Sequence, residues 1–113
     1  MQPFFYMFLK YIRSMFLYNI TIIAESDFAS GIGNRMQEFK TQFNAQSGKN
    51  RLKSLKMMDS PHEGVTYCLQ LEVGTQHEIA LFQQQHLLGL QSVLEQQFPG
   101  KALYFESIME YLD

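Results

Sequence analysis

The chain of 113 residues has the length of one ordinary domain and leaves little room for a second. Hydrophobic residues make up 46% and charged residues 18%, so the chain can build a core and is not expected to be disordered. The formal net charge of −2 argues against a general nucleic-acid-binding protein. A single cysteine excludes an internal disulfide and a multi-cysteine metal site.

The first stretch, residues 1–14, is aromatic and apolar, but it fits neither a membrane span nor a signal peptide. A span requires about 20 mostly apolar residues, and Lys10 and Arg13 interrupt this run. A signal peptide would carry its basic residues before the apolar stretch and small residues after it. The pattern therefore predicts neither secretion nor insertion into a membrane.

We interpret residues 1–14 as an extension ahead of one domain at 15–113, with translation starting at either Met1 or Met15. The alternative is a short amphipathic arm that packs on the domain or touches a membrane. Because no secretion signal is present, we expect a cytoplasmic protein in which the thiol of Cys68 is reduced.

Residues 15–24 read MFLYNITIIA, and so many β-branched and aromatic residues in a short run predict a strand. Ser26 or Asp27 can cap a helix that follows. Apolar residues then recur at spacings of four, four, three and four, which places them on one helix face: Phe28, Ile32, Met36, Phe39 and Phe43. Gly31 and Gly33 weaken the first turn of this helix by about 1 kcal/mol each relative to Ala.

Two strands are predicted in the middle of the chain, at 51–58 and 65–73. The turn-forming sequence SPHEG separates them at 60–64. In the second of these strands, Val, Tyr and Leu alternate with Thr, Cys, Gln and Glu, which is the period of a strand with one buried face.

The second helix is predicted to begin at a capping box formed by Thr75 and Glu78. Pro99 and Gly100 end it, and 102–112 forms the last strand. The predicted apolar stripe of the helix consists of Ile79, Phe82, His86, Leu90 and Val93, with Leu87, Leu94 and Phe98 beside it.

These elements give the order β-α-β-β-α-β, which places the chain in the α+β class. Each helix has one apolar stripe, so both helices can cover one face of a four-stranded antiparallel sheet. This is the ferredoxin-like arrangement. Right-handed crossovers would place the first and third strands in the centre of the sheet.

The sheet face without helices is the informative surface. Strand alternation places eight side chains of the two central strands on it: Leu17, Asn19, Thr21, Ile23, Thr66, Cys68, Gln70 and Glu72. The last strand is apolar on both sides. Because large exposed apolar patches mark interfaces, we expect two copies to pack sheet to sheet as a homodimer, a dimeric α+β barrel. Its central cavity would be lined by Asn19, Thr21, Cys68 and Gln70.

Charge is divided along the chain. Residues 1–56 carry eight basic and three acidic side chains, whereas 57–113 carry one basic and eight acidic side chains. The charges gather on the two predicted edge strands: Lys49, Arg51, Lys53 and Lys56 on one, and Glu106, Glu110 and Asp113 on the other. Edge charges commonly prevent the addition of further strands. The alternatives are contact between opposite edges of two subunits and an anionic ligand near Arg51.

The segments also resemble a known family. The opening strand from Met15, the sequence GVTY at 64–67 followed by Gln70, and the ending from Phe98 into Glu110 are similar to a bacterial domain-of-unknown-function family, number four-two-eight-six. The resemblance covers about residues 15–112 and implies a dimeric α+β barrel. The chain departs from the family pattern, which has a tryptophan and a histidine in the first helix region. This chain has no Trp, and its first histidine is His62.

The chemistry-bearing residues also have structural interpretations. His86, on an apolar helix stripe, is a packed core or boundary residue, with a ligand or acid–base role as the alternative. Cys68 is a small packing residue, because the sequence places no base beside it to make it a nucleophile. The histidines lack metal-ligand spacing, so we expect no metal site, no cofactor and no assigned catalytic residue. The ligand-binding candidates are Asn19, Thr21, Cys68, Gln70 and His86.

The sequence therefore favours a homodimer with a structural or small-molecule-binding role at its sheet-to-sheet cavity. Nucleic-acid binding is not expected, because the open-face positions of the third strand lack the aromatic residues of RNA-recognition domains. The first alternative is a cofactor-free enzyme of the dimeric barrel class, monooxygenase- or isomerase-like. In that enzyme Asn19, Gln70 and His86 would position a substrate. The second alternative is a regulatory interaction module that uses Arg51, Lys53 and Lys56.

Overall fold

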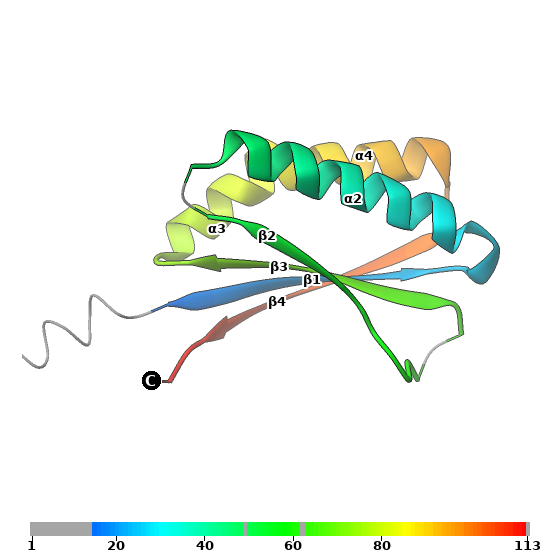
Figure 1. Ribbon diagram of the computed structural model, residues 1–113, viewed down its shortest axis with the longest axis horizontal. Coiled ribbons are helices and arrows are strands. Elements are labelled where there is room, and N and C mark those ends of the chain that lie inside the picture. The colour runs from blue at the N-terminus through cyan, green and yellow to red at the C-terminus, as the bar shows by residue number, and fades with distance from the viewer. Residues whose placement is uncertain (1–14, 49, 62, 113) are drawn as a thin grey trace, which may run out of the picture.

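The computed structural model describes residues 15–48, 50–61 and 63–112, and its elements follow the predicted order (Figure 1). They are β1 (Phe16–Ala24), a 3-10 turn (Ser26–Phe28), α2 (Ala29–Gln46), β2 (Leu52–Lys56), β3 (Val65–Val73), α3 (Gln76–Phe82), a π-helical turn (Gln83–Leu87), α4 (Leu88–Gln97) and β4 (Ala102–Glu110). The expected extension at 1–14 lies outside the described residues. No helix within the described part of the chain is both long and apolar enough to cross a membrane.

The four strands form one antiparallel sheet in the order β2-β3-β1-β4. The first and third strands therefore occupy the centre and β2 and β4 the edges, as predicted. The helices cover one face and leave the other bare (Figure 1). The predicted ferredoxin-like fold is confirmed. β2 and β4 are shorter than the sequence pattern suggested.

The core lies between the covered face of the sheet and the helices. Tyr18, Ile20 and Ile22 of β1 project into it and are fully buried. The register sets Ile20 opposite Leu69 and Tyr18 opposite Leu71 on β3, so the alternate residues of both central strands meet on the same face. Burial of each such side chain contributes about 1.5–3 kcal/mol, which makes this face the main source of stability.

The glycines at the start of α2 allow the helix to lie close to its neighbours. A Cβ atom at Gly33 would lie 2.7 Å from the Tyr67 hydroxyl, and one at Gly31 would lie 2.7 Å from the Phe98 ring. The Tyr67 hydroxyl donates a hydrogen bond of 3.0 Å to the carbonyl of Ala29. The helix begins after a 3-10 turn without a side-chain cap, so the expectation of a cap at residue 26 or 27 was wrong.

The start of the second helical segment agrees with its predicted cap, because the Thr75 hydroxyl accepts a 3.2 Å hydrogen bond from the amide of Glu78. In a capping box the third helical residue also accepts a hydrogen bond from the amide of the cap residue, and here that donor is the residue before the cap. The Glu78 carboxylate accepts from the amide of Gly74, at 3.2 Å, and not from that of Thr75.

The segment that the sequence predicted as one helix is interrupted by the π-helical turn. This turn inserts one extra residue and rotates all that follows. Leu87 and Leu94 are buried in consequence, whereas Val93 is 38% exposed and His86 is only half-buried. The predicted stripe was therefore wrong at Val93, because a constant helical period fails across a π-turn. His86, expected as a packed core or boundary residue, is partly buried against the rings of Phe43 and Phe82.

Candidate functional site

Four of the five predicted ligand-binding residues lie together on the open face, at the centre of the sheet. The Gln70 amide donates to the Asn19 side-chain oxygen at 3.1 Å, and the Asn19 amide donates to the Thr21 hydroxyl at 3.0 Å. The Thr21 hydroxyl lies 3.8 Å from the Cys68 sulfur. These four residues form a connected chain of polar side chains across β1 and β3, called here the polar line.

Apolar side chains border the polar line on both edge strands. Phe105 of β4 lies opposite Thr21, and Leu55 of β2 lies opposite Cys68. Phe105 is 56% and Leu103 is 61% exposed, and Leu55 and Met109 are also exposed. The open face is thus a polar centre within an apolar surround, here called the apolar border: Leu55, Leu103, Phe105 and Met109.

A shallow hollow of about 300 Å³ lies at one end of this face. It is lined by Met15, Leu17, Asn50, Arg51, Lys53, Gln70 and Glu72. Gln70 therefore connects the polar line to the hollow. Two side chains of the basic β2 edge also reach this hollow, whose lining includes two cations, one carboxylate and two amides.

Cys68 lacks the surroundings of a nucleophile. Its sulfur contacts the Thr21 hydroxyl, and no His, Lys or Arg of the described residues makes a hydrogen bond with it. An activated thiolate requires a neighbouring base or cation. Nor do three or more His, Cys, Asp or Glu side chains gather as potential metal ligands within the ranges that the structure describes.

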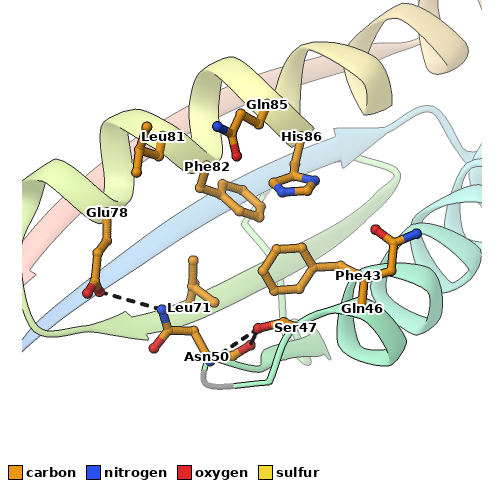
Figure 2. Close-up of a pocket in the computed structure, with 10 residues that line it drawn as sticks. All are labelled: Phe43, Gln46, Ser47, Asn50, Leu71, Glu78, Leu81, Phe82, Gln85 and His86. Atoms are coloured by element: carbon orange, nitrogen blue, oxygen red, sulfur yellow. Dashed lines mark hydrogen bonds between the residues drawn. The ribbon is translucent and has the colours of Figure 1, made fainter.

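His86 lies on the other side of the sheet, in the helical layer. It belongs to the π-turn and lines a cleft of about 370 Å³ (Figure 2). The Phe43 ring meets the imidazole edge-on at 5.0 Å between centroids, and the Phe82 ring lies 5.7 Å from it. Because the sheet separates His86 from Asn19 and Gln70, these three residues do not form one site within a chain.

A second polar cluster, on the covered face, was not predicted. The Tyr18 hydroxyl donates to the Glu106 carboxylate, and the Gln83 amide donates to that carboxylate at 2.9 Å and to the Tyr18 oxygen at 3.3 Å. Burial and the bond to Glu106 raise the pKa of Tyr18 above its ordinary value, so the phenol keeps its proton. No sequence pattern indicated this cluster, because its three residues come from segments far apart in the chain.

Comparisons with known proteins support the fold. Residues 15–112 match the family described as a domain of unknown function (DUF4286), which confirms the resemblance noted in the sequence. None of the curated proteins compared with the chain matches it.

Three solved structures share the architecture. One is a Nitrosomonas europaea protein whose name proposes an antibiotic biosynthesis monooxygenase, with 16% identity, TM-score 0.66 and coverage of 87% of this chain and 90% of that chain. Another is a Bacteroides thetaiotaomicron protein of unknown function whose name suggests an oxidoreductase, with 9% identity, TM-score 0.63 and coverage of 87% and 98%. The third is a de novo designed ferredoxin-fold protein, with 12% identity, TM-score 0.58 and coverage of 88% of each chain.

These likenesses are to the fold alone. A designed protein has the same architecture, so the architecture by itself specifies no activity. Any function of this chain must therefore be argued from its own side chains.

Proposed function

We propose that this chain, which belongs to the DUF4286 family, works as a homodimer that binds a small molecule between the open faces of its two sheets. The observation that supports the proposal is the combination of the apolar border with the polar line inside it. The proposal includes a cytoplasmic location and a domain at 15–113, as the sequence suggested.

The apolar border supports the dimer. Four large apolar side chains are exposed together on one face, which is unusual for a surface that stays in contact with water. A second copy offers the same face, and a two-fold arrangement can cover both at once. We infer that the partner that covers this face is another copy of the chain.

The polar line supports the ligand site. An amide side chain has two donor hydrogens and one acceptor oxygen. Gln70 uses one donor on Asn19, and no other side-chain bond of its amide is found among the described residues. Buried polar groups require partners, so groups left over after dimerisation would hydrogen-bond to a ligand. This matches pockets that orient a small molecule by a few polar groups in apolar surroundings.

The enzyme alternative is less well supported. The names of two structural neighbours propose oxygenase or oxidoreductase activity, but the identities of 16% and 9% carry only the fold. The substrate-positioning set considered for such an enzyme included His86, which lies across the sheet from Asn19 and Gln70. The regulatory alternative keeps the basic edge strand as its surface, with Arg51 and Lys53 at the hollow.

The dimer is tested by sedimentation velocity at micromolar concentration. The wild-type chain should sediment as a dimer, and Phe105→Glu should sediment as a monomer, because it would bury a charge in the interface. Leu88→Glu is a matched control, since Leu88 is 62% exposed but lies in the helical layer. It should remain a dimer. A monomeric wild-type chain would contradict the proposed interface.

The ligand site is tested separately by native mass spectrometry on freshly purified protein. We expect a dimer with a defined additional mass. The fraction of dimer that carries this mass should be lower in Gln70→Ala, which leaves the apolar border intact. If the protein is purified rapidly and without dialysis and the dimer still carries no additional mass, the proposed interface stands and the proposed ligand site is contradicted.

A further inference from the structure

We propose a second ligand site in the helical layer, at the cleft around His86, for a small uncharged aromatic molecule that carries a hydroxyl group, such as a phenol. The site lies on the opposite side of the sheet from the polar line. It depends neither on the dimer nor on the ligand of the open face.

The backbone at this cleft departs from regular geometry. Gln83–Leu87 form a π-helical turn within an otherwise α-helical segment. Such turns are rare and occur often at functional sites. Here the turn buries Leu87 in the core and places His86 at the cleft, whereas the helical period of the sequence predicts His86 on the buried stripe.

His86 also lies where two hollows meet. The cleft of Figure 2 is enclosed by the α3 and π-turn segment on one side and by the end of α2 with its following loop on the other. A neighbouring hollow of about 460 Å³ shares Gln85 and His86 with it and extends between α2 and α4. A ligand in the cleft would therefore contact the imidazole directly.

The imidazole nitrogens of His86 are available to bind a ligand. Its contacts within the described residues are with the rings of Phe43 and Phe82, and none of the hydrogen bonds found there includes its nitrogens. A neutral imidazole has one N–H donor and one nitrogen acceptor. A half-buried ring with both groups available, beside a cleft, is suited to bind a hydroxyl group.

The walls of the cleft indicate the rest of the ligand. Phe43, Leu71, Leu81 and Phe82 form the apolar and partly aromatic part of the lining, and the other described lining residues are polar. The Phe43 and Phe82 rings already pack edge to face, at 5.2 Å between centroids, which is the geometry that a further ring would continue. Among the described residues, the lining includes one carboxylate, Glu78, and no Lys or Arg, so these residues supply no cation to pair with an anionic ligand. These features favour a neutral ring over a carboxylate or phosphate.

The test uses 4-fluorophenol as the probe and fluorine NMR of the probe as the readout. We expect its signal to shift and broaden with the wild-type protein, and the dissociation constant to rise by about tenfold in His86→Leu. His77→Leu is the matched control, because His77 is exposed in the first turn of α3 and does not line the cleft. It should bind the probe as the wild type does.

A second variant keeps the test valid if His86→Leu lowers stability. Phe43→Leu retains an apolar wall but removes one ring, and it should weaken binding by a few fold with His86 in place. Circular dichroism and melting temperature establish that each variant is folded. No binding at millimolar probe, equal weakening by His77→Leu, or weakening by Asn19→Ala and not by His86→Leu would overturn the proposal.

Discussion

The two faces of the sheet are formed by alternate residues of the same strands, yet they differ in what covers them. On the covered face, Tyr18, Ile20 and Ile22 are fully buried by helices of their own chain. On the open face, Thr21 and its neighbours lie beside exposed Phe105 and Leu103. Alternation thus gives each strand one face that is buried by helices of the same chain and one face on which large apolar side chains stay exposed.

This difference indicates where stability and function are placed. Burial on the covered face supplies the hydrophobic stabilisation. Among the described residues, the Tyr104 hydroxyl is the one buried side-chain polar atom without a hydrogen-bond partner. The open face contributes less to the stability of a single chain, so its residues can serve to bind a partner or a ligand. Substitutions at neighbouring positions on one strand can measure that division.

The largest expected effect separates Ile22 from Ile23, which are adjacent in β1 and point to opposite faces. Ile22→Ala should lower the free energy of unfolding by about 2–5 kcal/mol, because it opens a cavity in the core. Ile23→Ala should cost about 1 kcal/mol or less in a single chain. Urea unfolding measures both.

The Ile experiment is best carried out in the Phe105→Glu background, which removes the contribution of dimerisation to stability. In the wild-type background Ile23→Ala should instead weaken the dimer. Equal losses of stability for the two isoleucines in single chains would contradict the division between the faces.

A smaller effect separates two helical glycines. Gly33→Ala should lower stability by about 1–3 kcal/mol, because its Cβ would lie 2.7 Å from the Tyr67 hydroxyl on the covered face. Gly89→Ala, in α4, should raise stability by about 1 kcal/mol, since a Cβ there meets nothing within 4 Å and Ala has the higher helix propensity. Thermal unfolding of both variants measures the pair, and a gain for Gly33→Ala would show that α2 does not pack as closely as described.

Much of this fold could be predicted because its signals are local. The alternation in β3 defined that strand from Val65 to Val73, and the Thr75 cap marked the start of α3. The same alternation brought Asn19, Thr21, Cys68 and Gln70 to one face, since residue parity alone decides it.

What could not be predicted depends on backbone or distant contacts. A π-turn changes the helical period without a sequence signature, so the exposure of Val93, which a constant period places on the buried stripe, could not be predicted. The bonds of Gln83 to Tyr18 and Glu106 join three separate segments, so only the packed structure brings them together. The role of Gly33 was equally hidden, because only the packed structure brings Tyr67 against it.

The smallest expected effect separates two tyrosines beneath the helices. Tyr18→Phe should lower stability by about 1–2 kcal/mol, because the Glu106 carboxylate loses a donor. Tyr104→Phe should be neutral or should raise stability by up to about 1 kcal/mol, since its buried hydroxyl has no hydrogen-bond partner among the described residues. Urea unfolding at pH 7 measures both, and a loss of stability in Tyr104→Phe that equals that in Tyr18→Phe would show that the Tyr104 hydroxyl has a partner.

The Tyr18 pair also predicts a dependence on pH. Burial first, and then the bond to Glu106, raise the pKa of Tyr18 above the value of about 10 that a tyrosine has in an unfolded chain. Above about pH 10 the unfolded chain loses this proton while the folded chain keeps it, so the folded state binds more protons and stability falls as pH rises. The free energy of unfolding of the wild type should therefore decline more steeply between pH 9 and 11 than that of Tyr18→Phe. This range is centred on about pH 10, where a tyrosine in the unfolded chain is half ionised. Parallel declines would mean that the phenol of Tyr18 ionises as easily in the folded chain as in the unfolded one, and that the covered face does not enclose it.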